Sequence, residues 1–233
     1  MTNEESFTAT HHALLFAWIA REIIQRVREG PGNTVVRTWV RRYGNERGRR
    51  MALRAQANGH PLTVENYFRY GEWSVGEGEM EQRLLEKSPR VTIHALKCPW
   101  FSAWKGSGLV IYGWLYCQGI DRALVEGFNP DLRIDVTRTL SNGGKECEFI
   151  FYDANLKEGP PEKKNVMPWS YHIGHLYGTA CQILTEACGK AGEEAISAAM
   201  EEFTRRFGEK AARRVIAESQ RDFTKDIYSR IGC

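Results

Sequence analysis

Residues 132–153 read LRIDVTRTLSNGGKECEFIFYD, and this stretch decides the fold class. Its two halves, LRIDVTRTL (132–140) and KECEFIFYD (145–153), are rich in β-branched and aromatic residues that roughly alternate with polar ones. The intervening SNGG favours a tight turn, because Asn and Gly accept positive φ angles. The stretch therefore predicts an antiparallel β-hairpin in the middle of the chain.

A third strand is predicted upstream of the hairpin, at RVTIHALKC (90–98), which has the same composition. Between this strand and the hairpin, residues 99–108 and 109–126 look helical, and Gly127 ends the second helix. Residues 157–168 are predicted to be a polar loop, because the segment is rich in charged residues and contains proline.

The two ends of the chain are predicted to be helical. Apolar residues recur at steps of three and four from about residue 10 to 30, followed by helices at 34–43, ending near Gly44, and at 46–57. The expected class is α+β, with a small antiparallel sheet flanked by N- and C-terminal helical segments that pack together. We expect one domain over residues 1–233, helical at 10–58, with the sheet and inserted helices at 61–153, a loop at 154–168 and helices at 169–230.

Composition excludes several classes of protein. The chain has 233 residues, 42% of them hydrophobic, and a net charge of +3, which favours a globular fold and does not require an anionic partner. The start of the chain is acidic where a signal peptide is basic, and no apolar run approaches the roughly 18 to 20 residues of a membrane span. We therefore expect a cytoplasmic protein with no membrane partner. Its six cysteines form no CxxC pair and are expected to be free thiols.

Cys117 and Asp121 are four residues apart on the predicted helix 109–126 and so would share a face. A carboxylate raises the pKa of a neighbouring thiol unless a cation or a histidine intervenes. Alternatively, Cys117 is a small buried residue, and Asp121 caps the helix or pairs with an arginine. Two further thiols attract attention: Cys147 is predicted to point inward from its strand, and Cys98 stands at the exit of another.

The sequence WSYHIGHLYG (169–178) places two histidines three residues apart on a predicted helix. His172 and His175 belong to a stripe with Thr179, Gln182 and Glu186, which is typical of a polar but enclosed surface. Three interpretations remain open: simple packing, a polar or catalytic site, and a metal site whose third ligand would be His94, Asp121 or a cysteine. The basic run RRYGNERGRR (41–50) is interpreted as a solvated helical face, so that no nucleic-acid partner is expected.

Four of these segments taken together, CPW, YCQGIDRALVEGFNPDL, ECEFIFY and WSYHIGHLYG, resemble the L-2-amino-thiazoline-4-carboxylic acid hydrolase family of bacterial proteins over roughly residues 12–215. The resemblance implies a hydrolase that opens a small heterocycle. Water adds to the C=N carbon of an aminothiazoline, and a ring bond then breaks to give a carbamoyl-cysteine.

The implied reaction needs a nucleophile or activated water, a proton donor and a pocket for the substrate carboxylate, and we assign these roles to particular residues as a hypothesis. Cys117 attacks the substrate or lines the pocket, His175 or His172 moves the proton, and Asp121 orients the histidine. The expected partner is a small heterocyclic substrate; no cofactor is assigned, although a divalent metal and a homo-oligomer stay open. The alternative function is a non-catalytic small-molecule-binding or sensor domain that uses the same pocket. Residues expected to bind the substrate are Asn129, Cys147, Cys98 and Tyr177.

Overall fold

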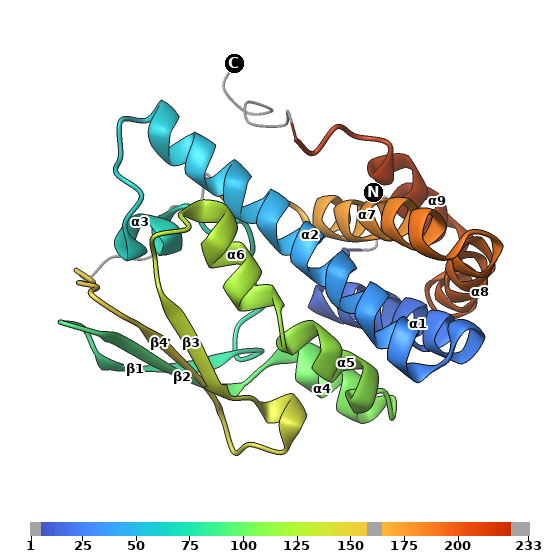
Figure 1. Cartoon of the computed structure of the whole chain (residues 1–233), viewed down its shortest axis with the longest axis horizontal. Helices are drawn as coiled ribbons and strands as arrows, with labels where there is room; N and C mark the ends of the chain where they lie inside the picture. The colour runs from blue at the N-terminus through green and yellow to red at the C-terminus, as the bar shows by residue number, and fades with distance from the viewer. Residues whose placement is uncertain (1–5, 158–164, 225–233) are drawn as a thin grey trace. The chain divides into compact units, whose positions relative to one another are not determined.

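The computed structural model describes residues 6–157 and 165–224 (Figure 1). The chain forms two compact units. The first, here called the helical unit, comprises residues 1–40, 99–118 and 168–221, and the second, the sheet unit, comprises residues 41–98, 119–167 and 222–233. The α+β class is confirmed, whereas the expectation of one domain stays a prediction.

The helical unit is built around α1 (Ala9–Val27), which packs against four helices. These are α4 (Pro99–Gly106), α5 (Val110–Cys117), α7 (Trp169–Cys188) and α8 (Lys190–Phe207). Helices from the two ends of the chain therefore pack together, as predicted. A close fit explains one glycine: a Cβ atom on Gly113 would lie 2.1 Å from the Trp104 ring. None of the described helices has the length and apolarity that crossing a membrane requires. The C-terminal helices are α7 (Trp169–Cys188), α8 (Lys190–Phe207) and α9 (Glu209–Ser219).

The sheet unit contains four antiparallel strands in the order β1-β2-β4-β3. One face of the sheet is covered by α3 (Val64–Arg69) and α6 (Ile120–Phe128) (Figure 1). The predicted hairpin is confirmed as β3 and β4, linked by a short 3-10 helix, η1 (Leu140–Asn142), and by Gly143 at φ 78°. The strand bounds are β1 (Glu81–Glu86), β2 (Val91–Lys97), β3 (Ile134–Arg138) and β4 (Cys147–Phe151).

The prediction of two helices between residues 34 and 57 is wrong, because a single helix, α2 (Glu29–Ala57), covers this range. Pro31 lies in its first turn, where a missing N–H costs nothing. Gly44 does not end the helix. It serves close packing instead, since a Cβ atom there would lie 2.6 Å from the Cβ of Ala123 in α6.

The single helix predicted over 109–126 is also interrupted. α5 ends at Cys117, Gln118 and Gly119 form a turn, and α6 begins at Ile120. The argument that Cys117 and Asp121 share a helix face because they are four residues apart is therefore wrong. Cys117 is the last residue of a helix in the helical unit, and Asp121 lies in the first turn of a helix in the sheet unit.

Candidate active site in the sheet unit

Three of the predicted site residues gather in the sheet unit: Cys98, Asp121 and Cys147. Cys147 begins β4 opposite Ala95 of β2, and Cys98 follows the last residue of β2. Strand alternation turns Cys147 toward the same face as Phe151, which packs with residues of α3 and α6. The charges of Cys98 and Asp121 both act on the Cys147 thiol. The strand pattern that predicted an inward Cys147 is confirmed.

The Cys147 thiol is held in its protonated form. Its side chain is buried, and the Leu140 backbone N–H donates a hydrogen bond to its sulfur at 3.3 Å. Burial raises the pKa of Cys147 to about 11, the hydrogen bond opposes this rise, and the negative charges of Cys98 and Asp121 add to it. A thiol of this kind is a weak nucleophile near neutral pH.

Asp121 has a carboxyl group that can exchange a proton near neutral pH. Burial raises its pKa to about 6, while the positive charge of Arg47 and a hydrogen bond from its own backbone N–H oppose the rise. A carboxyl group that titrates in this range suits general acid–base chemistry.

Tyr67 on α3 is a member of this site that the sequence did not indicate. Its ring packs edge-on against Phe128 at 5.7 Å between centroids, and burial together with the negative charge of Asp121 raises its pKa. The phenol group is therefore a hydrogen-bond donor throughout the ordinary pH range. No spacing or motif distinguishes Tyr67 from the other aromatic residues of the chain.

Arg47 supplies the positive charge of the site. It lies on α2 with only 3% of its surface exposed, and its guanidinium group stands 5.4 Å from the centre of the Tyr43 ring. Arg50, one helical turn further, is 1% exposed. The interpretation of residues 41–50 as a solvated face is thus wrong for these two arginines, although it holds for Arg41, Arg42 and Arg49, which are exposed.

A comparison with known protein families decides the classification. Residues 8–151 match the family model of L-2-amino-thiazoline-4-carboxylic acid hydrolase. The chain belongs to the L-2-amino-thiazoline-4-carboxylic acid hydrolase family. No curated protein and no solved structure matches the chain.

The match to the hydrolase family has a clear boundary. It contains all the site residues of the sheet unit described above, and also Cys117 and Asn129. It ends at residue 151, before α7, so His172, His175 and Tyr177 lie outside it. The α7 part of the resemblance therefore rests on the quoted sequence alone.

Asn129 has a structural role in this hydrolase-family chain. Its side-chain amide donates to the Leu62 carbonyl at 2.9 Å, and its side-chain oxygen accepts from the backbone N–H of Asp131 at 3.0 Å. These bonds fix the chain after α6. A contact between Asn129 and a substrate stays a prediction.

His94 faces away from Cys147. It pairs with Glu148 at 2.8 Å between Nε2 and Oε1, on the opposite side of the sheet from the pair of Ala95 and Cys147. This position does not support His94 as a ligand shared with the candidate site. Within residues 6–157 and 165–224, no group of three or more His, Cys, Asp and Glu side chains is arranged to hold a metal ion.

The polar stripe of α7 lies in the helical unit. His172, His175 and Thr179 are buried, with at most 4% of each residue exposed, which confirms the predicted enclosure for these three. The indole N–H of Trp39 reaches the Thr179 hydroxyl at 3.1 Å. The same stripe is exposed further along the helix, at Gln182 and Glu186, where the prediction of an enclosed face is wrong.

The remaining predicted residues are also in the helical unit. Tyr177 lines an open groove of about 650 Å³ between α7, α8 and α9, next to Cys181, whose pKa burial raises. Cys117 is half-buried at the end of α5. Proton transfer between Cys117 and His175 stays a prediction.

Proposed function

We propose that this family member is a hydrolase that opens a small cyclic amidine, of the kind represented by an aminothiazoline carboxylate. The observation that carries the proposal is Asp121, a carboxyl group with a pKa of about 6 that lies beside the charge of Arg47. Two cysteines and a tyrosine complete a set of proton donors and acceptors around it. All five residues lie within the part of the chain that matches the hydrolase family.

In the proposed reaction, Asp121 moves one proton. Its carboxylate removes a proton from water while the water oxygen forms a bond to the C=N carbon of the substrate. Asp121 passes this proton to the ring nitrogen as the tetrahedral intermediate forms, and Tyr67 donates a hydrogen bond to that nitrogen in the proposed arrangement. Asp121 then removes the proton of the new hydroxyl group and transfers it to the ring sulfur, while the carbon–sulfur bond breaks and the carbonyl group of the carbamoyl product forms.

Water is the nucleophile that these residues favour. The raised pKa of Cys147 leaves little thiolate near neutral pH, which supports a role in lining the pocket rather than in covalent attack. Attack by Cys117, with His172 or His175 moving the proton, is the second hypothesis. It predicts that a substrate-derived group becomes attached to Cys117, which intact-protein mass spectrometry would detect.

The decisive comparison is Asp121→Asn against Asp131→Asn, which changes an exposed carboxylate just after the same helix. We expect ring opening to fall by roughly 10²- to 10⁴-fold in the first variant, the usual contribution of a general acid–base group, and to be unchanged in the second. The measurement is product formation from 2-aminothiazoline-4-carboxylate, followed by mass spectrometry. Equal rates for Asp121→Asn and the unmodified protein would refute the assignment.

Product analysis separates this hydrolase from a binding or sensor domain. A sensor would raise the melting temperature of the protein in the presence of a cyclic amino-acid derivative and would return that compound unchanged. A hydrolase would release a carbamoyl amino acid whose mass exceeds that of the substrate by one water. Unchanged ligand with a clear thermal shift would therefore favour the sensor function.

A further inference from the structure

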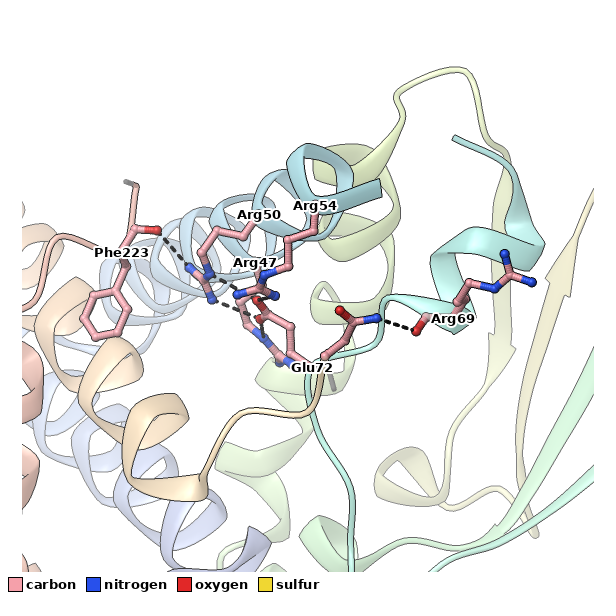
Figure 2. Close-up of polar contacts among 7 residues, drawn as sticks. Arg47, Arg50, Arg54, Arg69, Glu72 and Phe223 are labelled. Atoms are coloured by element: carbon pink, nitrogen blue, oxygen red, sulfur yellow. Dashed lines mark hydrogen bonds and ion pairs between the residues drawn. The ribbon is translucent and has the colours of Figure 1, made fainter. Parts of the chain in front are cut away.

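Glu72 is the centre of a buried cluster of charges in the sheet unit (Figure 2). It is fully buried, and its carboxylate accepts from Arg50 Nε at 3.2 Å, Arg50 Nη2 at 3.0 Å and Arg54 Nη1 at 2.7 Å. The third arginine, Arg47, reaches it with Nε at 3.5 Å. The Glu72 backbone is held as well, because its carbonyl accepts from the Met167 N–H at 2.7 Å.

A buried cluster of charges is an inefficient source of folding stability. A buried ion pair often contributes no more to stability than apolar residues of the same volume, because desolvation offsets the attraction between the charges. What a cluster with several fixed hydrogen bonds does provide is a defined position for each charge. A fixed charge of this kind can act on a neighbouring site, and the three arginines differ in this respect.

Arg47 differs from Arg50 and Arg54 because its charge acts on the candidate site. It opposes the rise in the pKa of both Asp121 and Tyr67. Arg50 in turn donates to the Phe223 carbonyl at 3.3 Å, a contact with the C-terminal segment of the unit. Of the three arginines, Arg47 is thus the one that joins Glu72 to Asp121.

The backbones of α2 and α6 bring Arg47 to Asp121. A Cβ atom on Gly48 would lie 2.1 Å from the carbonyl oxygen of Leu124, so the helices approach one another as closely as their main chains allow. Arg47 is the neighbour of Gly48, and Asp121 lies one turn before Leu124. The geometry of this helix pair is therefore independent support for the electrostatic link.

We propose that Glu72 is a positioning residue that holds the guanidinium group of Arg47 beside Asp121 and Tyr67. In this way it determines the charge state in which Asp121 meets the substrate. The proposal rests on the proposed function for its role in catalysis, whereas the link between the three residues is a property of the protein without substrate.

Two roles of Glu72 predict opposite results. If Glu72 holds Arg47 in place, the substitution Glu72→Gln lets the guanidinium group move away, and Asp121 loses a stabilising cation, so that its titration midpoint rises. If Glu72 only screens Arg47, the same substitution strengthens the positive field at Asp121, and the midpoint falls.

The experiment is a pH titration of the Asp121 carboxyl carbon by NMR on the 233-residue chain. We expect the midpoint to rise by roughly 0.5 to 1 unit in both Arg47→Gln and Glu72→Gln. In the double variant, Glu72→Gln should add nothing to Arg47→Gln, because the effect passes through Arg47. Arg54→Gln is the matched control, since it removes another arginine from the same carboxylate and should leave the midpoint unchanged.

The proposal is overturned by a lowered or unchanged midpoint in Glu72→Gln, or by additive shifts in the double variant. Should Glu72→Gln fail to fold, as judged by circular dichroism, Glu72→Asp keeps the charge and retracts it by one methylene group. A raised midpoint in Glu72→Asp supports the proposal, and an unchanged or lowered one overturns it.

This titration separates the inference from the proposed hydrolase activity. It needs no substrate, so absence of ring opening in the unmodified protein would refute the proposed function and leave the result on Glu72 valid. Where ring opening is observed, the midpoint of its pH profile should move in the same direction as the NMR midpoint in each variant.

Discussion

Cys147 stands directly opposite Ala95 in the antiparallel pair of β4 and β2, on the face of the sheet that α3 and α6 cover. Because the side chain of Ala95 is small, the Cys147 thiol lies beside the candidate site. The Leu140 backbone N–H donates a hydrogen bond to the Cys147 sulfur. This position explains why burial is the largest cause of the raised pKa of Cys147.

We predict that Cys147 reacts slowly with iodoacetamide at pH 7, because its pKa of about 11 leaves little thiolate. The rate should increase steadily as the pH rises toward 10. Peptide mapping by mass spectrometry would measure the rate at each pH, with a short unstructured cysteine peptide as the reference. Labelling of Cys147 at the rate of that peptide at pH 7 would contradict the prediction.

Asp121 should determine the pH dependence of ring opening. As a base it acts when ionised, so kcat/KM should rise with pH and level off above its pKa of about 6. Burial raises this pKa above the ordinary value of 3.8, and the stability linked to Asp121 is therefore present below about pH 4 and lost as the pH rises through 6.

The same argument predicts that Asp121→Asn stabilises the fold at pH 7 while it removes activity. Urea unfolding at pH 7 and pH 3.5 would measure this, and the gain in stability should be found only at the higher pH. If the variant is less stable than the unmodified protein at pH 7, ionisation of Asp121 does not destabilise the fold, and the prediction is wrong.

His11 should make the helical unit sensitive to acid. The N–H and hydroxyl groups of Thr8 both lie close to His11 Nδ1, at 3.2 and 3.0 Å, so the neutral ring caps the start of α1. Burial and the charge of Arg206 lower the pKa of His11 to about 4, against 6.5 when unfolded. The stability linked to His11 is complete above pH 6.5 and is lost as the pH falls toward 4.

Replacement by glutamine tests this cap. His11→Gln keeps a side-chain acceptor at the third helical position but does not titrate, so the loss of stability between pH 6.5 and 4 should become smaller. Thermal unfolding followed by circular dichroism across this range would show the difference. Parallel pH curves for the two proteins would mean that His11 is not responsible.

Gly48→Ala should destabilise the sheet unit, because the added Cβ would lie 2.1 Å from the Leu124 carbonyl oxygen. We expect a loss of about 1 to 3 kcal/mol in the free energy of unfolding, as for other overpacked positions. Gly30→Ala, near the start of the same helix, has no atom within 4 Å of its new Cβ and should be neutral or stabilising by about 0.5 to 1 kcal/mol. Urea unfolding measures both, and equal values would refute the prediction.

Local patterns predicted most of the fold. The hairpin and the inward Cys147 follow from alternation, and α1 and α7 follow from their apolar spacing. β1 was missed because its sequence, EQRLLE, lies at an exposed edge of the sheet and carries no alternation. The continuation of α2 through Gly44 was missed because this glycine is required for packing against Ala123, which is distant in the sequence.

The candidate site was predictable only in part, for a similar reason. Asp121, Cys98 and Cys147 were predicted because carboxyl and thiol groups are common in catalytic sites. Arg47 and Arg50 read as solvent-exposed charges, because nothing near them in the sequence shows that Glu72 will meet them in the interior. The turn at Gln118 and Gly119 was hidden by helix-compatible residues on both sides.

The burial of Glu72 among Arg47, Arg50 and Arg54 also constrains how these positions can diverge among relatives. A codon change that removes the glutamate takes away, in one step, the acceptor that the three arginines share, whereas a change at Arg54 leaves the other two contacts in place. Relatives that lack the glutamate should therefore also lack buried arginines at these positions, so that the four positions change together rather than independently.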